Sequence, residues 1–479
     1  MTRSVIVLAL AGLASCTSPP PPVLPGDGAL PVPAGFRQAD TAEPAPLPLD
    51  WWAQFDDPDL TRLIETALRE NARLDAADAS VEAAEALLQR TALGRSLSTA
   101  TSASAEVGRT PGDGQDTDLR TDGALRASWE ADLFGRVRSL IDSAEFDLQA
   151  ARETRRDLAV VIASETALAY TALRGAQARL DVARQNADAQ TQSLELLQTL
   201  QENGRATRLD VERARTQFRQ TLATIPTLES DATAALNRLA ALTGRSASDP
   251  GPFLLSLREM PADVPMLSGA LVTGTPEDLL RRRPDIRRAE ADLASRLALG
   301  QAARADLFPT ITLDARLVAS ARELEDLTRS TSLGFGIGPA LTWAGPDLRA
   351  VRATIALNDA QAREALATYE QTLLDALSEV ETALSDYRRE LQRQAELEQA
   401  VSAARESLTL ANLRYTEGLD DFLDVLDAQR TLLSVEDQLA VSRLQSARLA
   451  VLSYRSLGGM WDTGTLTAFR ATSGDASDD

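Results

Sequence analysis

The chain carries an internal duplication with one constant offset, and this feature constrains the fold more than any other. The segment around Gly204, followed by Leu209-Asp210-Val211, recurs 214 residues later around Gly418, followed by Leu423-Asp424-Val425. The same offset links Trp129 to Trp343, Val137-Arg138 to Val351-Arg352, Ser164-Glu165 to Ser378-Glu379, and Gly244 to Gly458. A register this constant means two copies of one unit without a gap, and so long a period indicates domain-sized copies rather than a solenoid.

Each copy contains a long segment with the composition of a helix. After Gly135, the run through Gln201 has no proline and only one glycine, Gly175, and its counterpart from about Leu348 to Glu417 has neither. Roughly 67 residues at about 1.5 Å each would make a rod of about 100 Å. Apolar residues recur at spacings of three and four, which predicts one stripe buried against other helices. They include Leu158, Val161, Ile162, Leu168 and Leu173.

The first residues have the order of a secretory signal that ends at the only cysteine of the chain. Arg3 precedes the apolar run Val5 to Leu13, which is too short to span a bilayer. Leu13-Ala14-Ser15-Cys16 is similar to the bacterial lipobox, in which the cysteine receives a diacylglyceryl group and begins the mature chain. The alternative is an unmodified cysteine after an ordinary signal. Thr17 is not the aspartate that retains such lipoproteins at the inner membrane, so the resemblance implies sorting to the outer membrane.

Four segments of about ten residues alternate between apolar and polar side chains, as strands do. They are Leu97 to Val107, Leu119 to Leu133, Leu307 to Ala319 and Ser332 to Trp343, of which the first is the weakest. Each copy therefore has the order helix, two strands, very long helix, helix. The alternation is typical of transmembrane barrel strands, apolar toward lipid and polar toward a water-filled lumen, although a half-buried soluble sheet would show it too. An acylated cysteine upstream favours the membrane.

Four strands from one chain cannot close a barrel in a bilayer. Open edges are not tolerated in hydrocarbon, and known single-chain barrels begin at about eight strands. Several chains must therefore share one barrel. Two copies would supply about eight strands and three about twelve, and the residues alone leave this choice open.

Composition excludes most other classes of function. The chain has 49 Lys and Arg against 70 Asp and Glu, a formal net charge of -21, so the basic surface that binds nucleic acid is missing. It has no histidine, the commonest general base and a frequent zinc ligand, and one cysteine cannot build a metal site alone. The carboxylates lie at helical-face spacing without a base, nucleophile or metal set. We therefore expect no enzyme, no cofactor and no metal.

Three motifs in order resemble a known family, the TolC-like outer-membrane factors, and within it the lipoprotein subgroup called NodT or OprM-like. They are Leu279 to Glu290, with Arg281-Arg282-Arg283-Pro284-Asp285 in it; Leu307-Phe308-Pro309-Thr310; and Tyr415-Thr416-Glu417-Gly418 with Leu423 to Gln429 after it. The resemblance covers about Trp51 to Trp461. Two positions depart from it. Arg95-Ser96-Leu97 stands where the second copy has Leu307-Phe308-Pro309, and Asp420, beside Asp421, stands where relatives often carry a basic or neutral residue.

The resemblance implies a mainly α fold with a transmembrane β part: a homotrimer with a 12-stranded β-barrel in the outer membrane and a long α-helical barrel in the periplasm. It also implies a passive exit duct of a tripartite RND-type efflux system, carrying drugs or other small solutes from periplasm to exterior. The implied partners are a periplasmic adaptor, an inner-membrane RND transporter and outer-membrane lipid. The transported solutes and the resting state stay open.

The resemblance also places two sites at the turns that follow the long helices. Gly204 and Gly418 are the expected adaptor-docking residues, although plain helix C-caps would use glycine too. Asp424 and Asp427, three residues apart on one helix face, are the expected lumenal charges of a periplasmic gate, with a solvated acidic face as the alternative. The closing contacts would come from Asp210, Tyr415 and a nearby arginine, with Arg208 and Arg430 as candidates. Asp420 makes a family-type Arg–Asp gate contact doubtful here.

Two other functions are alternatives to an efflux duct. A duct of a type I secretion system would use the same fold, although the lipobox and the Arg-Arg-Arg-Pro-Asp motif favour efflux. From a different class, a lipid-anchored structural or adhesive coiled-coil protein would share the long helices.

The domain boundaries that we expect follow the duplication. They are a signal peptide at 1–15, a lipid-anchored proline-rich tether at 16–50, a first repeat at 51–245, a linker at 246–275, a second repeat at 276–460 and a tail at 461–479.

Overall fold

The protein is described by a computed structural model, in which residues 33, 35–37, 50–108, 118–260, 263–321 and 329–459 are placed. Cys16, nearly all of the tether and the tail lie outside the described residues. Within them the first copy comprises η2 (Trp51–Phe55), α2 (Pro58–Glu70), α3 (Ala72–Ala92), η3 (Leu93–Arg95), β1 (Ser98–Gly108), β2 (Asp118–Ala131), α4 (Arg136–Glu202) and α5 (Arg208–Leu242). After α6 (Pro252–Glu259), the second copy comprises α7 (Pro276–Arg282), α8 (Pro284–Ala305), β3 (Thr310–Ala321), η5 (Ser330–Ser332), β4 (Leu333–Thr342), α9 (Arg349–Thr416) and α10 (Phe422–Ser456).

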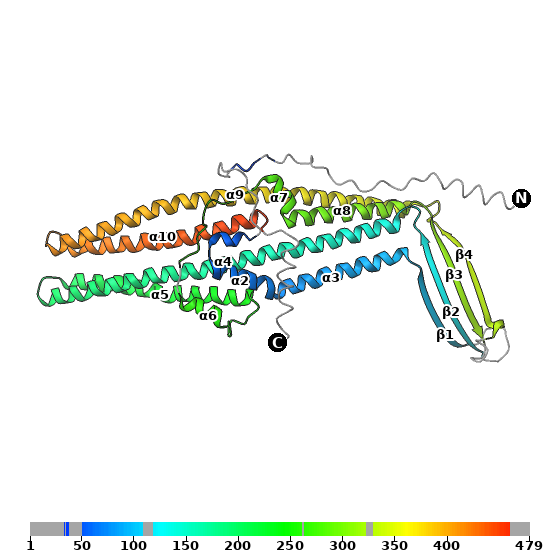
Figure 1. Ribbon diagram of the computed structural model, residues 1–479, viewed down its shortest axis with the longest axis horizontal. Helices are drawn as coiled ribbons and strands as arrows, with labels where there is room; N and C mark the ends of the chain where they lie inside the picture. Colours follow the sequence, from blue (N-terminus) through cyan, green and yellow to red (C-terminus); the bar gives the residue numbers. More distant parts are fainter. Residues whose placement is uncertain are drawn as a thin grey trace. The chain divides into compact units, whose positions relative to one another are not determined.

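This order confirms the element order that the duplication predicts, and the two long helices begin and end within two residues of the expected positions. Figure 1 shows α5 running back along α4 and α10 running back along α9. No helix in the described part of the chain is long and apolar enough to cross a membrane. The chain divides into two compact units, and each unit contains segments of both copies.

The first unit includes the described residues of Asp78–Thr154 and Asp285–Thr372 and contains one antiparallel sheet in the order β1-β2-β3-β4. The register puts the alternating apolar positions of all four strands on one face. Leu125 of β2 lies opposite Leu317 of β3, which lies opposite Phe335 of β4, and Thr101 of β1 joins the same row. Large apolar side chains on this face are exposed, up to 87% for Phe335.

The other face of the sheet is polar and internally hydrogen-bonded. Ser128 Oγ donates to Asp314 Oδ1 at 2.6 Å, and Ser320 Oγ donates to Asp122 Oδ1 at 2.5 Å. A sheet with one exposed apolar face and one charged face is not a soluble sheet packed on a core, because such a sheet would bury the apolar side. The arrangement fits a strand set between lipid and water.

The helices of the first unit meet through small and charged side chains. Ser143 of α4 and Ser295 of α8 lie 2.9 Å apart, hydroxyl to hydroxyl, and both are buried. Glu153, only 2% exposed, forms an ion pair of 3.2 Å with Arg287. Ala144 of α4 and Ala291 of α8 are buried as well, and such small side chains allow helix backbones to approach closely.

The second unit contains the main aromatic core. Trp51 stacks on Tyr454 with ring centroids 5.5 Å apart, and Tyr454 donates to Gln54 Oε1 at 2.5 Å. Burial raises the pKa of Tyr454 to about 12, so its hydroxyl stays a donor at physiological pH. These contacts join the first described helix to α10, the last helix of the second copy.

A buried arginine organises the segment between the two copies. Arg174 is 2% exposed and donates to Tyr170 Oη at 3.1 Å, to Asp59 Oδ2 at 3.3 Å and to the Met260 carbonyl at 2.8 Å. The last bond satisfies a carbonyl at the end of α6. The linker is therefore not wholly irregular, because Pro252 stands in the first turn of α6 and two leucines of this helix are buried.

Candidate functional site

The two expected turns are built alike. Gly204 follows α4 and Gly418 follows α9, each with φ +70°. Arg205 N donates to the Leu200 carbonyl at 2.8 Å, and Leu419 N donates to the Arg414 carbonyl at 2.9 Å, which is the six-residue bond of a Schellman C-cap. A Cβ added at either glycine would meet nothing within 4 Å. Both glycines are thus required by backbone conformation and face open space.

The turns pack against each other through a small apolar cluster in the second unit. Leu197, Val211 and Ala214 of the first copy meet Phe422 and Val425 of the second, all less than a tenth exposed. The Tyr415 ring joins the cluster, edge to face on Phe422 with centroids 5.3 Å apart. The two helix pairs are therefore held together directly behind their turns.

The first turn is closed by a neutral hydroxyl and a carboxylate of the same helix. Asp210 N donates to Thr207 Oγ1 at 3.2 Å, while Thr207 N and Thr207 Oγ1 donate to Asp210 Oδ2 at 3.0 and 2.6 Å. This reciprocal pair is a capping box at the start of α5. Asp210, expected as a gate contact, thus already has a structural role inside its own chain.

The second turn is closed by an ion pair instead. The Asp421 side chain makes no cap bond to α10. Arg414 in the last turn of α9 reaches over Gly418 and donates to both oxygens of Asp420, through Nη2 at 2.7 Å and through Nε at closer range. The guanidinium lowers the pKa of Asp420 below its usual range, and Asp420 raises the pKa of Arg414. Asp420 thus finds an arginine within its own chain.

Tyr415 packs against the cluster that contains Val211, the residue that follows Asp210 in α5. Burial raises the pKa of the Tyr415 hydroxyl, and the charge of Asp210 raises it further. The arginine that opposes this shift is Arg205, which the sequence did not suggest. Of the expected arginines, Arg430 interacts within its own helix, where its Nη1 lies 3.9 Å from Asp427 Oδ1.

Asp424 and Asp427 lie on the exposed first turns of α10. The Asp427 side chain is 75% exposed, and Asp424 is exposed as well. The charge of Asp424 adds to that of Asp420 in raising the pKa of Arg414. Asp424 and Asp427 thus form an acidic edge of α10, and Arg414, which is already paired with Asp420, is the arginine whose pKa Asp424 affects.

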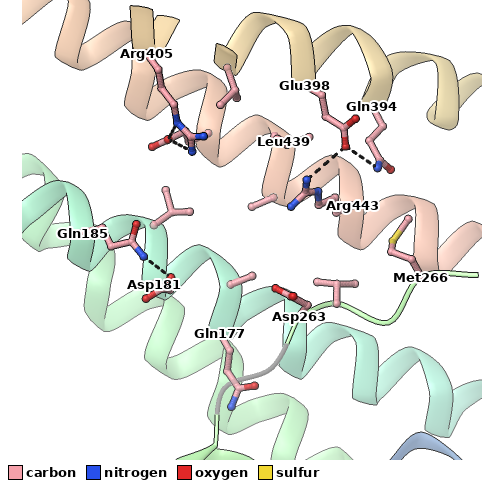
Figure 2. A pocket seen from close by; sticks show the side chains of 16 residues that line it. Gln177, Asp181, Gln185, Asp263, Met266, Gln394, Glu398, Arg405, Leu439 and Arg443 are labelled. Carbon is pink, nitrogen blue, oxygen red and sulfur yellow. Dashed lines mark hydrogen bonds and ion pairs between the residues drawn. The ribbon is translucent and has the colours of Figure 1, made fainter. Parts of the chain in front are cut away.

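A pocket of the second unit is lined mainly by polar and charged side chains. Its cavity volume is about 720 Å³, and α4, α9, α10 and the linker around Val264 line it. Figure 2 shows both arginines of the pocket engaged with glutamates: Arg405 forms an ion pair of 2.7 Å with Glu436, and Arg443 lies 3.4 Å from Glu398. Among the described residues, no three His, Cys, Asp or Glu side chains gather as a metal site.

The family model described as "Outer membrane efflux protein" matches residues 63–245 and 275–459. A probable efflux pump outer membrane protein, SepC of Pseudomonas putida, is 33% identical over 435 residues, 86% of each chain. OprJ of Pseudomonas aeruginosa is 31% identical over 87% of each chain. The solved outer-membrane channel OprN is 37% identical with a TM-score of 0.85, covering 93% of this chain and 99% of its own.

Proposed function

The chain belongs to the outer membrane efflux protein family, and from this premise we propose that three copies form the exit duct of a tripartite efflux pump. An outer-membrane efflux channel of this family is a passive duct and not an enzyme. The finer proposal concerns its assembly: a homotrimer that receives solutes through a periplasmic adaptor from an inner-membrane RND transporter.

The observation that carries the assembly is the sheet. The register of its four strands creates one apolar face and one charged face. In the described chain, β1 and β4 each have one edge without a partner strand. Unpaired backbone groups are too costly in hydrocarbon, so the edges must pair with other copies. Three copies would give about twelve strands, which leaves an aqueous lumen larger than that of about eight strands.

We propose that Cys16 carries a lipid anchor and that the segment to residue 50 tethers it to the first repeat. The lipobox sequence supports this, as does the apolar face of the sheet, which needs the same membrane. The expected division into two repeats at 51–245 and 276–460 is retained as part of the proposal. Cys16→Ala should abolish acylation, and an unchanged acylated mass in that variant would refute the anchor.

The turns are the proposed adaptor-docking surface, with Gly204 and Gly418 at its centre. Their open surroundings support this, because a partner can approach the backbone there without displacing any side chain. Threefold symmetry would present six such turns in one ring. An adaptor that binds the open form more tightly would shift the duct toward it.

The proposed gate lies on the helices behind these turns. Asp424 and Asp427 from three copies would place six carboxylates around the axis, attracting cations to the lumen. Asp210 and Tyr415 would hold the closed state. The packing of Tyr415 against the cluster that contains Val211, next to Asp210 in α5, supports this, as does the effect of the Asp210 charge on the pKa of Tyr415.

The function is tested in cells that lack their own outer-membrane efflux channel but keep a compatible adaptor and RND transporter. We expect this chain to restore resistance to pump substrates. A Cys16→Ala chain with an ordinary signal shows separately whether resistance depends on the lipid anchor. Growth no better than that of the empty strain, despite trimers in the outer membrane, would contradict an efflux duct.

A further inference from the structure

Two arginines face each other on the polar face of the sheet. Arg126 of β2 and Arg316 of β3 are directly opposite in the antiparallel register, and both are exposed. Opposite residues on one face have Cβ atoms about 5 Å apart, and like charges at such positions destabilise a sheet. The fold therefore keeps a concentrated positive charge at this level of the strands, at a cost in stability.

Neither guanidinium group has a partner in the part of the chain that the structure describes. No hydrogen bond or ion pair joins Arg126 or Arg316 to another described residue. The remaining arginine of β2 on this face behaves differently, because Arg120 Nε lies 3.0 Å from Asp122 Oδ2. Arg120 thus has its charge compensated within its own strand, whereas the opposed pair does not.

The carboxylates near the pair on this face are already engaged. Asp314 lies two residues from Arg316, about 7 Å along the strand. Its two oxygens accept hydrogen bonds from Ser128 Oγ at 2.6 Å and from Thr312 Oγ1 at 2.7 Å. Asp122 accepts from Ser320 at 2.5 Å in addition to its ion pair. Hydroxyl groups therefore satisfy these carboxylates and leave the positive charge of the pair without a counter-ion.

Small neighbours leave the two arginines open to a solute. Ala100 of β1 lies opposite Arg126, and Gly336 of β4 lies opposite Arg316. A Cβ added at Gly336 would lie 3.4 Å from Arg316 Nε, so the Arg316 side chain lies close to the bare β4 backbone. The next row of the polar face carries no charge and consists of Ser102, Ala124, Val318 and Gly334.

We propose that Arg126 and Arg316 form an anion-binding site in the lumen of the barrel, where small solutes with a carboxylate, sulfonate or phosphate group bind on their way out. The inference rests on the proposed function, since three copies would bring six guanidinium groups to one level of the lumen. A guanidinium group binds such oxyanions through two parallel hydrogen bonds, and rings of arginine line pores that select anions.

The exposure of the pair sets the strength of this site. Both side chains are in contact with water, where dissolved salt screens their charge. Passage through a pore requires binding that is favourable enough for entry and weak enough for release. An exposed arginine pair satisfies both requirements, whereas a buried pair would retain the anion.

The test is the equilibrium binding of a trisulfonated pyrene dye to detergent-solubilised trimers of the full mature chain at low salt, followed by fluorescence anisotropy. Binding at equilibrium needs no current, so a closed periplasmic gate does not affect the result. Citrate and inorganic phosphate are added as competitors that carry only carboxylates or only phosphate. Light scattering of the same samples reports the oligomeric state.

The chain offers a matched control. Arg126→Gln, Arg316→Gln and Arg120→Gln each remove one charge per copy from the same face of the sheet. Only Arg120 is paired with a carboxylate in the parent. We expect each change in the opposed pair to weaken dye binding about fivefold and Arg120→Gln to weaken it less than about twofold. Citrate and phosphate should both displace the dye from the parent.

Four results would contradict the site. Equal weakening in all three variants would show general attraction by positive charge, and trimers of the parent that bind no dye would leave a duct without an anion site. Loss of trimers in Arg126→Gln or Arg316→Gln, but not in Arg120→Gln, would show that the pair binds a neighbouring copy. A parent that is folded but only monomeric would contradict the proposed assembly and the site with it.

Discussion

The first and second helical turns share a backbone but not the interaction that closes them. Both have glycine at φ +70° and the same six-residue hydrogen bond. The first is then closed by the Thr207–Asp210 capping box, the second by the Arg414–Asp420 ion pair. A capping box is short-ranged and little affected by salt, whereas an exposed ion pair is weakened by salt and acid. The two copies thus share the backbone geometry of the turn but differ in how strongly salt and acid affect the interaction that closes it.

Replacing the turn glycines should have the largest effect. Gly204→Val or Gly418→Val forces a β-branched residue into the left-handed region at about 1–2 kcal/mol, although its Cβ would meet no neighbour. We expect resistance to fall to that of cells without the channel, while trimers remain in the membrane. Asparagine tolerates this backbone, so Gly418→Asn separates bulk at the docking surface from strain. Normal resistance in both valine variants would contradict docking at the turns.

Neutralising the acidic edge of α10 should have the next largest effect. Asp424→Asn with Asp427→Asn removes up to six charges from the proposed lumenal ring, so cation selectivity and block by multivalent cations should both weaken in single-channel recordings. Glu396→Gln with Glu406→Gln removes as many exposed charges from α9 and serves as the matched control. Equal changes in both variants, or none in either, would leave Asp424 and Asp427 as a solvated helix face.

The capping box separates two roles of Asp210. Thr207→Ala removes the N-cap side chain and should cost about 1 kcal/mol of stability. Asp210→Asn keeps an acceptor for Thr207 but removes the charge near Tyr415, so thermal stability should change little while resting conductance rises. Asp210→Ala would mix both effects. If the Asp210→Asn channel stays closed at rest, with the conductance of the parent, Asp210 is not part of the gate.

The smallest effect should come from the ion pair of the second turn. The pKa of Asp420 is lowered in the folded chain, so its contribution is present above the unfolded pKa and is lost as the pH falls through the folded one. The Arg414 side chain is exposed and the Asp420 side chain is only half-buried, and this contact with water limits the gain in stability. The Tm difference between the parent and Asp420→Asn should be small at neutral pH and low salt, and should disappear in high salt or acid. A difference that persists in high salt would require another partner for Asp420.

The elements that sequence predicts best are those set by local periodicity. Helical spacing in α4 and α9 and the two-residue alternation of β2 and β4 are properties of neighbouring residues, so they are visible without tertiary structure. The Thr207–Asp210 box was also readable, because threonine three residues before aspartate at a helix start is its signature. The family resemblance assigns Asp210 to the gate, and the capping box is a second role of the same side chain.

The contacts that sequence did not predict depend on chain reversal. Arg414 and Asp420 are six residues apart and meet only because Gly418 turns the backbone between them. Arg174 binds the end of α6, more than 80 residues away, and thereby gives structure to a segment whose prolines and glycines suggested a plain linker. Both cases join charges to partners that no spacing rule connects.

The most direct test of shared barrel closure is disulfide cross-linking between sheet edges. Ser102→Cys on β1 is combined in one chain with Gly334→Cys, Gly336→Cys or Gly338→Cys on β4, all on the polar face. If three copies close one barrel, at least one combination should give covalent dimers and trimers in outer membranes, with no larger species. A ladder that stops at dimers, or continues beyond trimers, would contradict the three-copy barrel.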